Sequence, residues 1–377
     1  MLFLSLLVLA FAASALPLPA AAEPGQKAAV TTEDGVRVVR NPKTPVAGPG
    51  GAPAVVTLVE DLVIGDDSER DDHWFSFLNS LAVDDEGNIY TVDPKAIRIR
   101  VFGPDGSLLR AFGRAGQGPG EFSGPGGIVA VPDGTVLIGD ALTRRVSHFN
   151  AKGEYLKDTP LVTLRLAGLV IDAHKNLYAI HFVRGEKLAM ELIKLDPDLK
   201  PLLTIHTLSI DSKPRTTEIF SLRLFYDVAG GDRLAWMVSD SYEIRVVDAS
   251  GRTLMKILKD HAPRRLTAKD REEHLRRRFP KGFKPLPGEE LVFPNVFPAA
   301  AAFMADETGR IYVRTYDADG RGGEAVDVFS PEGLYVARFF VPWNEVTVTV
   351  RNGKLYCYIQ ESESGYPLVK RYAMNWK

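Results

Sequence analysis

The chain has 377 residues, and its 46 Lys+Arg against 48 Asp+Glu give a formal net charge of −2. Hydrophobic residues make up 45% and charged residues 25%, an ordinary globular balance that argues against a disordered or collagen-like chain. The net charge provides no overall field to hold nucleic acid, and a single cysteine, Cys357, excludes both an intramolecular disulfide and a cysteine-based zinc site.

The first segment is predicted to be an export signal. Residues 1–16 are almost wholly apolar, and Ala20 to Ala22 follow them as an A-x-A cleavage pattern, although no Lys or Arg precedes the run. The alternative is a membrane anchor, but the run is shorter than the roughly 20 residues that a spanning helix needs. We therefore expect a signal peptide over residues 1–22, a secreted or periplasmic protein, and no stable membrane span after cleavage.

Residues 23–54 follow the signal and are rich in Ala, Pro and Gly. Because such a composition buries too little apolar surface to fold, we predict a flexible linker here.

From residue 78 onward the chain repeats a pattern of paired hairpins. LAVDDEGNIY (81–90) and IVAVPDGTVL (128–137) each read as an alternating strand, a polar turn with Gly and a second strand. A second hairpin turn follows at a similar distance in most copies. Four strands in about 40–45 residues are the signature of a β-propeller blade.

Six copies of this unit are present, and the last one lacks a fourth strand before Lys377. Residues 55–65, VVTLVEDLVIG, have no blade of their own and would supply that outer strand, leaving no open edge. The sequence therefore predicts an all-β fold over residues 55–377, a six-bladed propeller in which an N-terminal strand closes the last blade. We expect it to be a monomer.

The first two copies also carry a family resemblance. Residues 80–140, with the linker GQGPGEF (116–122) between two blades, resemble two consecutive NHL repeats. The whole chain resembles bacterial secreted six-bladed propeller proteins of the NHL type, although His174 and Lys175 replace the usual Asp-Gly of a turn. The resemblance implies the fold but no single activity, because NHL-type propellers include lyases, RNA binders and protein scaffolds.

An insertion over residues 260–296 separates blades 4 and 5. Thr267 and Asp270 have the spacing of a capping box, and Leu275 and Phe279 share a helical face, so we predict a helix over about 268–279. Residues 263–284 contain nine Lys or Arg and three Asp or Glu. Two interpretations stay open, a basic docking arm over one face or a solvated helix that caps a blade.

A ligand would be expected on the face that carries the loops between blades and the hairpins between second and third strands. Arginine and tyrosine are frequent there, and arginine presents a planar fork of donors to anions, although any one of these side chains could simply hold loops together. The candidate binding residues are Arg114, Gln117, Asp140, Arg144, His181, Arg184, Tyr242, Arg314 and Tyr316.

Motifs of catalysis are missing from the sequence. It contains no HExxH, GxSxG, P-loop or GxGxxG after a strand, and of the residues expected to open onto the central channel only Asn79 and Glu345 could ligate a metal. The favoured hypothesis is a non-catalytic module without a cofactor that binds a protein, peptide or glycan. The alternative is a hydrolase or lyase with calcium or zinc at the channel, using Asn79, Glu345 and His181. RNA binding is opposed by the predicted export and the net charge.

Overall fold

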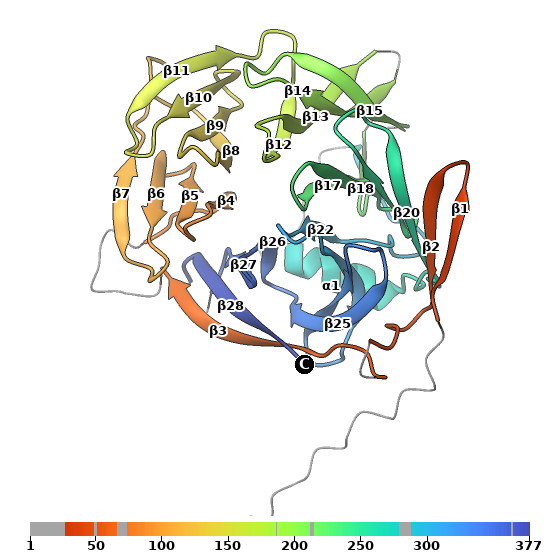
Figure 1. Ribbon diagram of the computed structural model, residues 1–377. Coiled ribbons are helices and arrows are strands. Elements are labelled where there is room, and N and C mark those ends of the chain that lie inside the picture. The colour runs from red at the N-terminus through yellow and green to blue at the C-terminus, as the bar shows by residue number, and fades with distance from the viewer. Residues whose placement is uncertain are drawn as a thin grey trace, which may run out of the picture.

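The computed structural model describes residues 27–48, 51–65, 74–185, 187–211, 215–278, 288–362 and 365–377. The predicted signal peptide over residues 1–22 lies outside these ranges. Six sheets are arranged radially around a centre, each with its first strand innermost (Figure 1). The predicted all-β, six-bladed propeller is confirmed.

Each blade is an antiparallel meander that runs from the centre outward, because its strands alternate in hydrophobicity and are joined by tight turns. The turn glycines Gly87 and Gly134 both have a φ of +83°, which a side chain would strain. The first three blades consist of β4 (Ser80–Val83), β5 (Ile89–Asp93), β6 (Arg98–Phe102) and β7 (Leu108–Phe112); β8 (Pro125–Ala130), β9 (Val136–Asp140), β10 (Arg145–Phe149) and β11 (Tyr155–Pro160); and β12 (Leu166–Ile171), β13 (Leu177–Arg184), β14 (Leu188–Leu195) and β15 (Pro201–Ile210).

The remaining blades continue the same pattern around the ring (Figure 1). They consist of β17 (Leu224–Ala229), β18 (Arg233–Val238), β19 (Glu243–Val247) and β20 (Thr253–Lys259); β22 (Ala302–Ala305), β23 (Ile311–Ala318), β24 (Gly323–Phe329) and β25 (Tyr335–Pro342); and β26 (Val346–Arg351), β27 (Lys354–Ile359), β28 (Leu368–Trp376) and β3 (Val56–Ile64).

The ring is closed as predicted, by a strand from the N-terminal part of the chain. β3 pairs antiparallel with β28, from Val56 opposite Trp376 to Ile64 opposite Val369. The outer edge of blade 6 is thereby completed by residues more than 300 positions away in sequence, which ties the two ends of the propeller together.

The predicted flexible linker over residues 23–54 is wrong for residues 29–41. These form a hairpin of β1 (Ala29–Glu33) and β2 (Val36–Asn41), and β2 adds parallel to β20 as a fifth strand of blade 4. Val38 and Val39, which lie between the exposed Arg37 and Arg40, are buried, so this short run does bury apolar surface. The hairpin was not predicted because the surrounding residues are rich in Ala, Pro and Gly.

Asn41, at the end of β2, links this hairpin to blade 5. Its amide donates to the carbonyl of Gly333 over 2.9 Å, and its side-chain oxygen accepts from the backbone N–H of Tyr335 over 2.8 Å. The N-terminal segment therefore fastens blades 4, 5 and 6 together before the first blade begins.

The hydrophobic core lies between neighbouring blades. Val92 and Ile99 of blade 1 share one buried cluster with Ile128 and Ile138 of blade 2, and similar clusters join the other pairs. Each blade therefore depends on its neighbours for burial, as expected of repeats that cannot fold alone.

The insertion contains one helix, α1 (Ala268–Arg278), close to the prediction of 268–279, although Phe279 lies outside the described residues. Thr267 and Asp270 form the predicted cap, with the N–H of Asp270 donating to the Thr267 hydroxyl over 3.2 Å and the N–H of Thr267 donating to the Asp270 carboxylate over 2.9 Å. A short parallel pair, β16 (Thr216–Glu218) and β21 (Glu290–Val292), fixes the return of the insertion. No helix in the described ranges is long and apolar enough to cross a membrane.

Candidate ligand-binding face

The propeller has two faces of different construction. The loop face is the face formed by the connections between blades and by the hairpins between second and third strands. The turn face is the opposite one, with the hairpins between first and second and between third and fourth strands. The loop face is where the sequence predicts a ligand.

An Asp and a Tyr that recur in several repeats of the chain stabilise the turn face itself. The carboxylate of Asp84 accepts hydrogen bonds from the backbone and side chain of Asn88 and from the hydroxyl of Tyr90 over 3.0 Å. The same arrangement joins Asp172 to Tyr178 and Asp306 to Tyr312. Burial, together with the neighbouring Asp84, raises the pKa of Tyr90 to about 12, so this hydroxyl remains a donor. The Asp and Tyr of the repeat therefore stabilise the hairpin turns between first and second strands.

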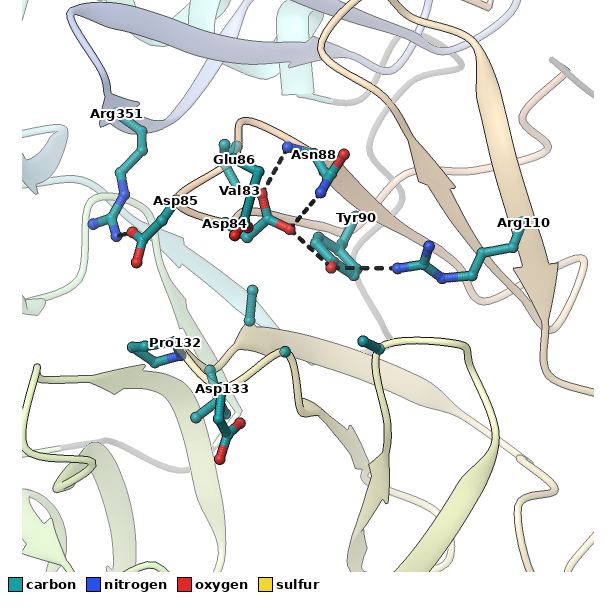
Figure 2. A pocket seen from close by; sticks show the side chains of 14 residues that line it. Val83, Asp84, Asp85, Glu86, Asn88, Tyr90, Arg110, Pro132, Asp133 and Arg351 are labelled. Carbon is teal, nitrogen blue, oxygen red and sulfur yellow. Dashed lines mark hydrogen bonds and ion pairs between the residues drawn. The ribbon is translucent and has the colours of Figure 1, made fainter.

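A cavity of about 400 Å³ lies on the turn face between blades 1 and 2 (Figure 2). Two of its carboxylates form ion pairs. Asp85 pairs with Arg351 of blade 6, and Asp133 pairs with Lys175 of blade 3 over 2.8 Å. Lys175 and the turn hydrogen bonds lower the pKa of Asp133 to about 2 against the opposing effect of burial. These ion pairs link neighbouring blades.

The central channel is a cavity of about 710 Å³ lined by the inner strands. Its main polar groups bridge blades. The hydroxyl of Tyr226 in blade 4 contacts the carbonyls of Ala167 and Gly168 in blade 3. Asp227 accepts the backbone N–H of Ala305 in blade 5 over 2.8 Å. Burial raises the pKa of Asp227 to about 6 in spite of this hydrogen bond.

On the loop face, Asp140 is a structural residue. Its Oδ2 accepts the backbone N–H groups of Ser123 and Gly124, and its Oδ1 accepts those of Leu142 and Thr143. Burial acts to raise the pKa of this carboxyl, but the hydrogen bonds from Thr143, Gly124 and Ser123 outweigh it and the pKa is lowered. An ionised carboxylate at the end of β9 thus fixes both the incoming loop and the next hairpin, and it has no capacity left for a ligand.

The other candidates of this region divide into anchored and exposed side chains. Arg144 donates to the carbonyls of Leu161 and Val162, and these hydrogen bonds fix the position of its guanidinium. Arg114 is exposed and pairs with Glu121 at 3.0 Å. Gln117 is also exposed, and its backbone carbonyl accepts from Arg145.

In blade 3 the two candidates differ in the same way. His181 is half-buried and lies 3.5 Å from the carboxylate of Glu191 on the neighbouring strand. Arg184, at the end of β13, is exposed, and no described residue pairs with its guanidinium.

The sequence places Tyr242 and Arg314 on the exposed loop face, but both side chains are buried in the structure. Tyr242 is buried between blades 4 and 5 and donates to Asp327 over 2.5 Å. Arg314 is buried too, paired with Glu324 at 2.9 Å and donating to backbone carbonyls of the loop to blade 6. Tyr242 lies in the hairpin just before β19 and Arg314 lies on β23, and both side chains are covered by neighbouring parts of the chain, a tertiary arrangement that sequence position alone does not reveal.

Tyr316 belongs to an aromatic cluster that holds the insertion. Its ring lies 5.2 Å from that of Phe220 and 5.0 Å from that of Phe297, while His274 of α1 lies 4.2 Å from Phe220. Arg264 covers the ring of Phe297 at 3.9 Å. The helix is therefore packed onto the loops of blades 4 and 5, which is the capping interpretation, while Lys269 and Arg276 remain exposed.

The two tentative metal ligands differ in their surroundings. Asn79 is exposed at the entrance of blade 1. Glu345 is buried, with one carboxylate oxygen accepting from Tyr372 over 2.6 Å and the other lacking a described hydrogen-bond partner. In the described ranges, no group of three or more His, Cys, Asp or Glu is placed to hold a metal ion.

The loop face has an apolar character that the sequence analysis did not predict. Leu142 and Val162 are 73% and 74% exposed, and Phe182 and Leu222 are also exposed on this face. The exposed large apolar residues of the described chain lie either on the loop face, on outer strands or next to them, and none lies in a hairpin turn of the turn face. The signal was available, since single apolar residues interrupt otherwise polar loops, but the sequence gives no measure of exposure.

The loop face also contains a groove of about 340 Å³ between blades 2 and 3. Two of the predicted residues, Asp140 and Arg144, line it. The others that line it were not predicted: Ala141, Leu161, Leu164, Arg165, Leu166 and Phe182.

Comparison with known proteins supports the fold alone. No protein-family model matches the chain, and no curated protein sequence matches it. Among solved structures, a candidate exported protein from Bacteroides fragilis matches with a TM-score of 0.54 and 9% identity, covering 90% of this chain and 99% of that one. A member of the DUF4221 family from Bacteroides vulgatus matches with a TM-score of 0.50 and 11% identity, covering 85% and 98%. At these identities the chain is similar to both in its propeller architecture.

Proposed function

We propose that the protein is a secreted or periplasmic six-bladed propeller of the NHL type that binds a protein or peptide ligand with its loop face. The observation that carries this proposal is the distribution of exposed apolar side chains. Four of these side chains lie on one face of the ring: Leu142, Val162, Phe182 and Leu222. Their contact with water is unfavourable in free energy, and a bound partner would remove that contact. Exposed apolar groups next to arginine are characteristic of protein interfaces.

Two further observations support a binding role for this face. The closed ring and the interlocked N-terminal segment make a rigid platform, which reduces the entropy that ordering a binding site would cost. The helical insertion is fixed on the same face by the aromatic cluster around Phe220, and it adds exposed Lys269 and Arg276 at the rim. Apolar contacts favour a protein or peptide over a glycan.

The proposal is tested by capture of ligands from a cell-envelope extract with two matched triple variants. The loop-face variant carries Leu142→Ser, Val162→Ser and Leu222→Ser. The control variant changes three similarly exposed leucines on outer strands, and these are Leu109→Ser, Leu156→Ser and Leu202→Ser.

A specific ligand should be captured by the wild type and by the outer-strand variant, and at least tenfold less by the loop-face variant. The captured ligand is then purified and its binding to the three proteins measured by calorimetry. Equal binding to all three proteins would refute a role for the loop face. Thermal unfolding of each variant checks that the fold is intact.

A further inference from the structure

The groove between blades 2 and 3 is a chemically distinct part of the loop face. Its floor is apolar, formed by Leu161, Leu164, Leu166 and Phe182. Phe182 is exposed although it is aromatic, and Leu142 and Val162 follow directly after two groove residues in the chain. A leucine- or phenylalanine-sized side chain that enters this groove would be removed from water, which favours binding.

The rim of the groove is positively charged. Arg165 is exposed, and its backbone carbonyl accepts the N–H of Phe182 over 3.0 Å, so its main chain is fixed at the groove. Arg184 lies two residues beyond Phe182 on β13 and therefore on the same face of that strand. No described residue pairs with either guanidinium.

Among the described residues, the acid that lines the groove offsets only part of this charge, because Arg144 and Arg165 also line it and Arg184 lies beside it. Asp140 is the single acid among the groove-lining residues, and its two oxygens are saturated by four backbone N–H groups. Glu191 faces His181. Arg144 is held by two carbonyls of the neighbouring loop, which leaves its positive charge without a carboxylate.

We propose that this groove binds a peptide segment in which a large apolar side chain is followed by a carboxylate. The apolar side chain packs on Phe182 and the leucines, and the carboxylate accepts hydrogen bonds from Arg165, with Arg184 adding to the positive potential. Arginine is suited to this role because its planar fork matches a carboxylate in a bidentate manner. The inference rests on the proposed binding role of the loop face and names the ligand chemistry of one subsite.

The experiment measures fluorescence anisotropy of labelled peptides with the full-length mature protein. The first probe is Gly-Ser-Leu-Phe-Glu-Gly with an amidated C-terminus. Matched probes replace Glu by Gln, replace Leu-Phe by Ser-Ser, or end in Leu-Phe with a free terminal carboxylate and no Glu. The first probe should bind at least tenfold more tightly than the Gln and Ser-Ser probes. The last probe distinguishes an internal acidic side chain from a chain end as the source of the carboxylate.

Three variants assign the binding to the groove. Arg165→Gln should weaken the Glu probe to the level of the Gln probe and leave the Gln probe unchanged. Phe182→Ser should weaken both. Arg233→Gln, which removes an exposed arginine on the turn-face side of β18, should change neither.

The inference is overturned if the Glu probe binds no better than the Gln or Ser-Ser probe, or if Arg165→Gln leaves its affinity unchanged. Its failure differs from failure of the proposed function. If Arg165→Gln and Phe182→Ser still capture the envelope ligand while the loop-face triple variant does not, the face binds its ligand outside this groove. If the triple variant also captures it normally, the proposed function fails as well.

Discussion

Replacing Asp327 by Asn is expected to weaken the joint between blades 4 and 5 more than any surface change. Asp327 is fully buried, and it accepts hydrogen bonds from Lys259 Nζ at 2.9 Å, Tyr242 at 2.5 Å, Tyr335 at 2.6 Å and Arg338 Nε at 2.6 Å. Burial acts to raise the pKa of Asp327, but the charges of Lys259 and Arg338 outweigh it, so the carboxyl has a lowered pKa and stays ionised at neutral pH.

The magnitude follows from what the substitution leaves behind. The ammonium of Lys259 lies between the rings of Tyr242 and Tyr335, 4.7 and 4.8 Å from their centroids, with its side chain 2% exposed. Without Asp327 this buried charge loses its counter-ion, and breaking a buried pair in this way costs about 3–5 kcal/mol. A typical domain has only about 5–15 kcal/mol of unfolding free energy.

Urea denaturation at pH 7 measures the effect. Asp327→Asn should lower the free energy of unfolding by about 3–5 kcal/mol. Adding Lys259→Met removes the stranded charge and should recover part of the loss, because an apolar replacement of a whole buried pair is far less costly than removing one partner. The control is Asp198→Ala, which breaks an exposed pair with Lys157 and should cost below about 1 kcal/mol. A loss below about 1 kcal/mol for Asp327→Asn would refute the reasoning.

Three further predictions concern the channel, the thiol and the N-terminal hairpin. Because burial raises the pKa of Asp227 to about 6, its contribution favours the folded state below pH 4 and is lost as pH rises through 6. The unfolding free energy of the wild type relative to Asp227→Asn should therefore fall by up to about 3 kcal/mol between pH 4 and 7, and a pH-independent difference would contradict this. Burial raises the pKa of the Cys357 thiol, so iodoacetamide at pH 8 should label it only after unfolding; rapid labelling of the native protein would show that the site is open. A chain that starts at residue 55 should lose at least about 3 kcal/mol relative to one that starts at residue 27, because Val38 and Val39 are buried on blade 4; equal urea midpoints would show that the hairpin contributes nothing.

The fold was predictable because it is periodic. Hairpin turns with glycine recur at a regular spacing, and the missing fourth strand of the last copy indicates how the ring closes. The β1–β2 hairpin was not predictable in this way, because it adds in parallel to a strand more than 200 residues away and its Val38 and Val39 stand in an Ala/Pro/Gly-rich segment. Only the assembled blade 4 provides the surface that they bury.

The sequence predicts a candidate face, but it does not predict which side chains of that face are accessible. Topology predicts that Arg144 and Arg184 lie on the loop face, yet it cannot tell that Tyr242 and Arg314 are covered by neighbouring loops. Nor can it reveal that both carboxylate oxygens of Asp140 accept hydrogen bonds from four backbone N–H groups. The groove around Arg165 depends on how blades 2 and 3 meet, which no local pattern encodes.

The binding role of the loop face is tested most directly by amide hydrogen exchange of the protein with and without its purified ligand. The footprint locates the contact without any substitution. We predict slower exchange in the loop-face segments 141–144, 161–165, 220–223 and 343–346, with the turn-face segments 84–88, 132–135 and 306–310 unchanged. Protection confined to the turn-face segments would contradict the proposed function.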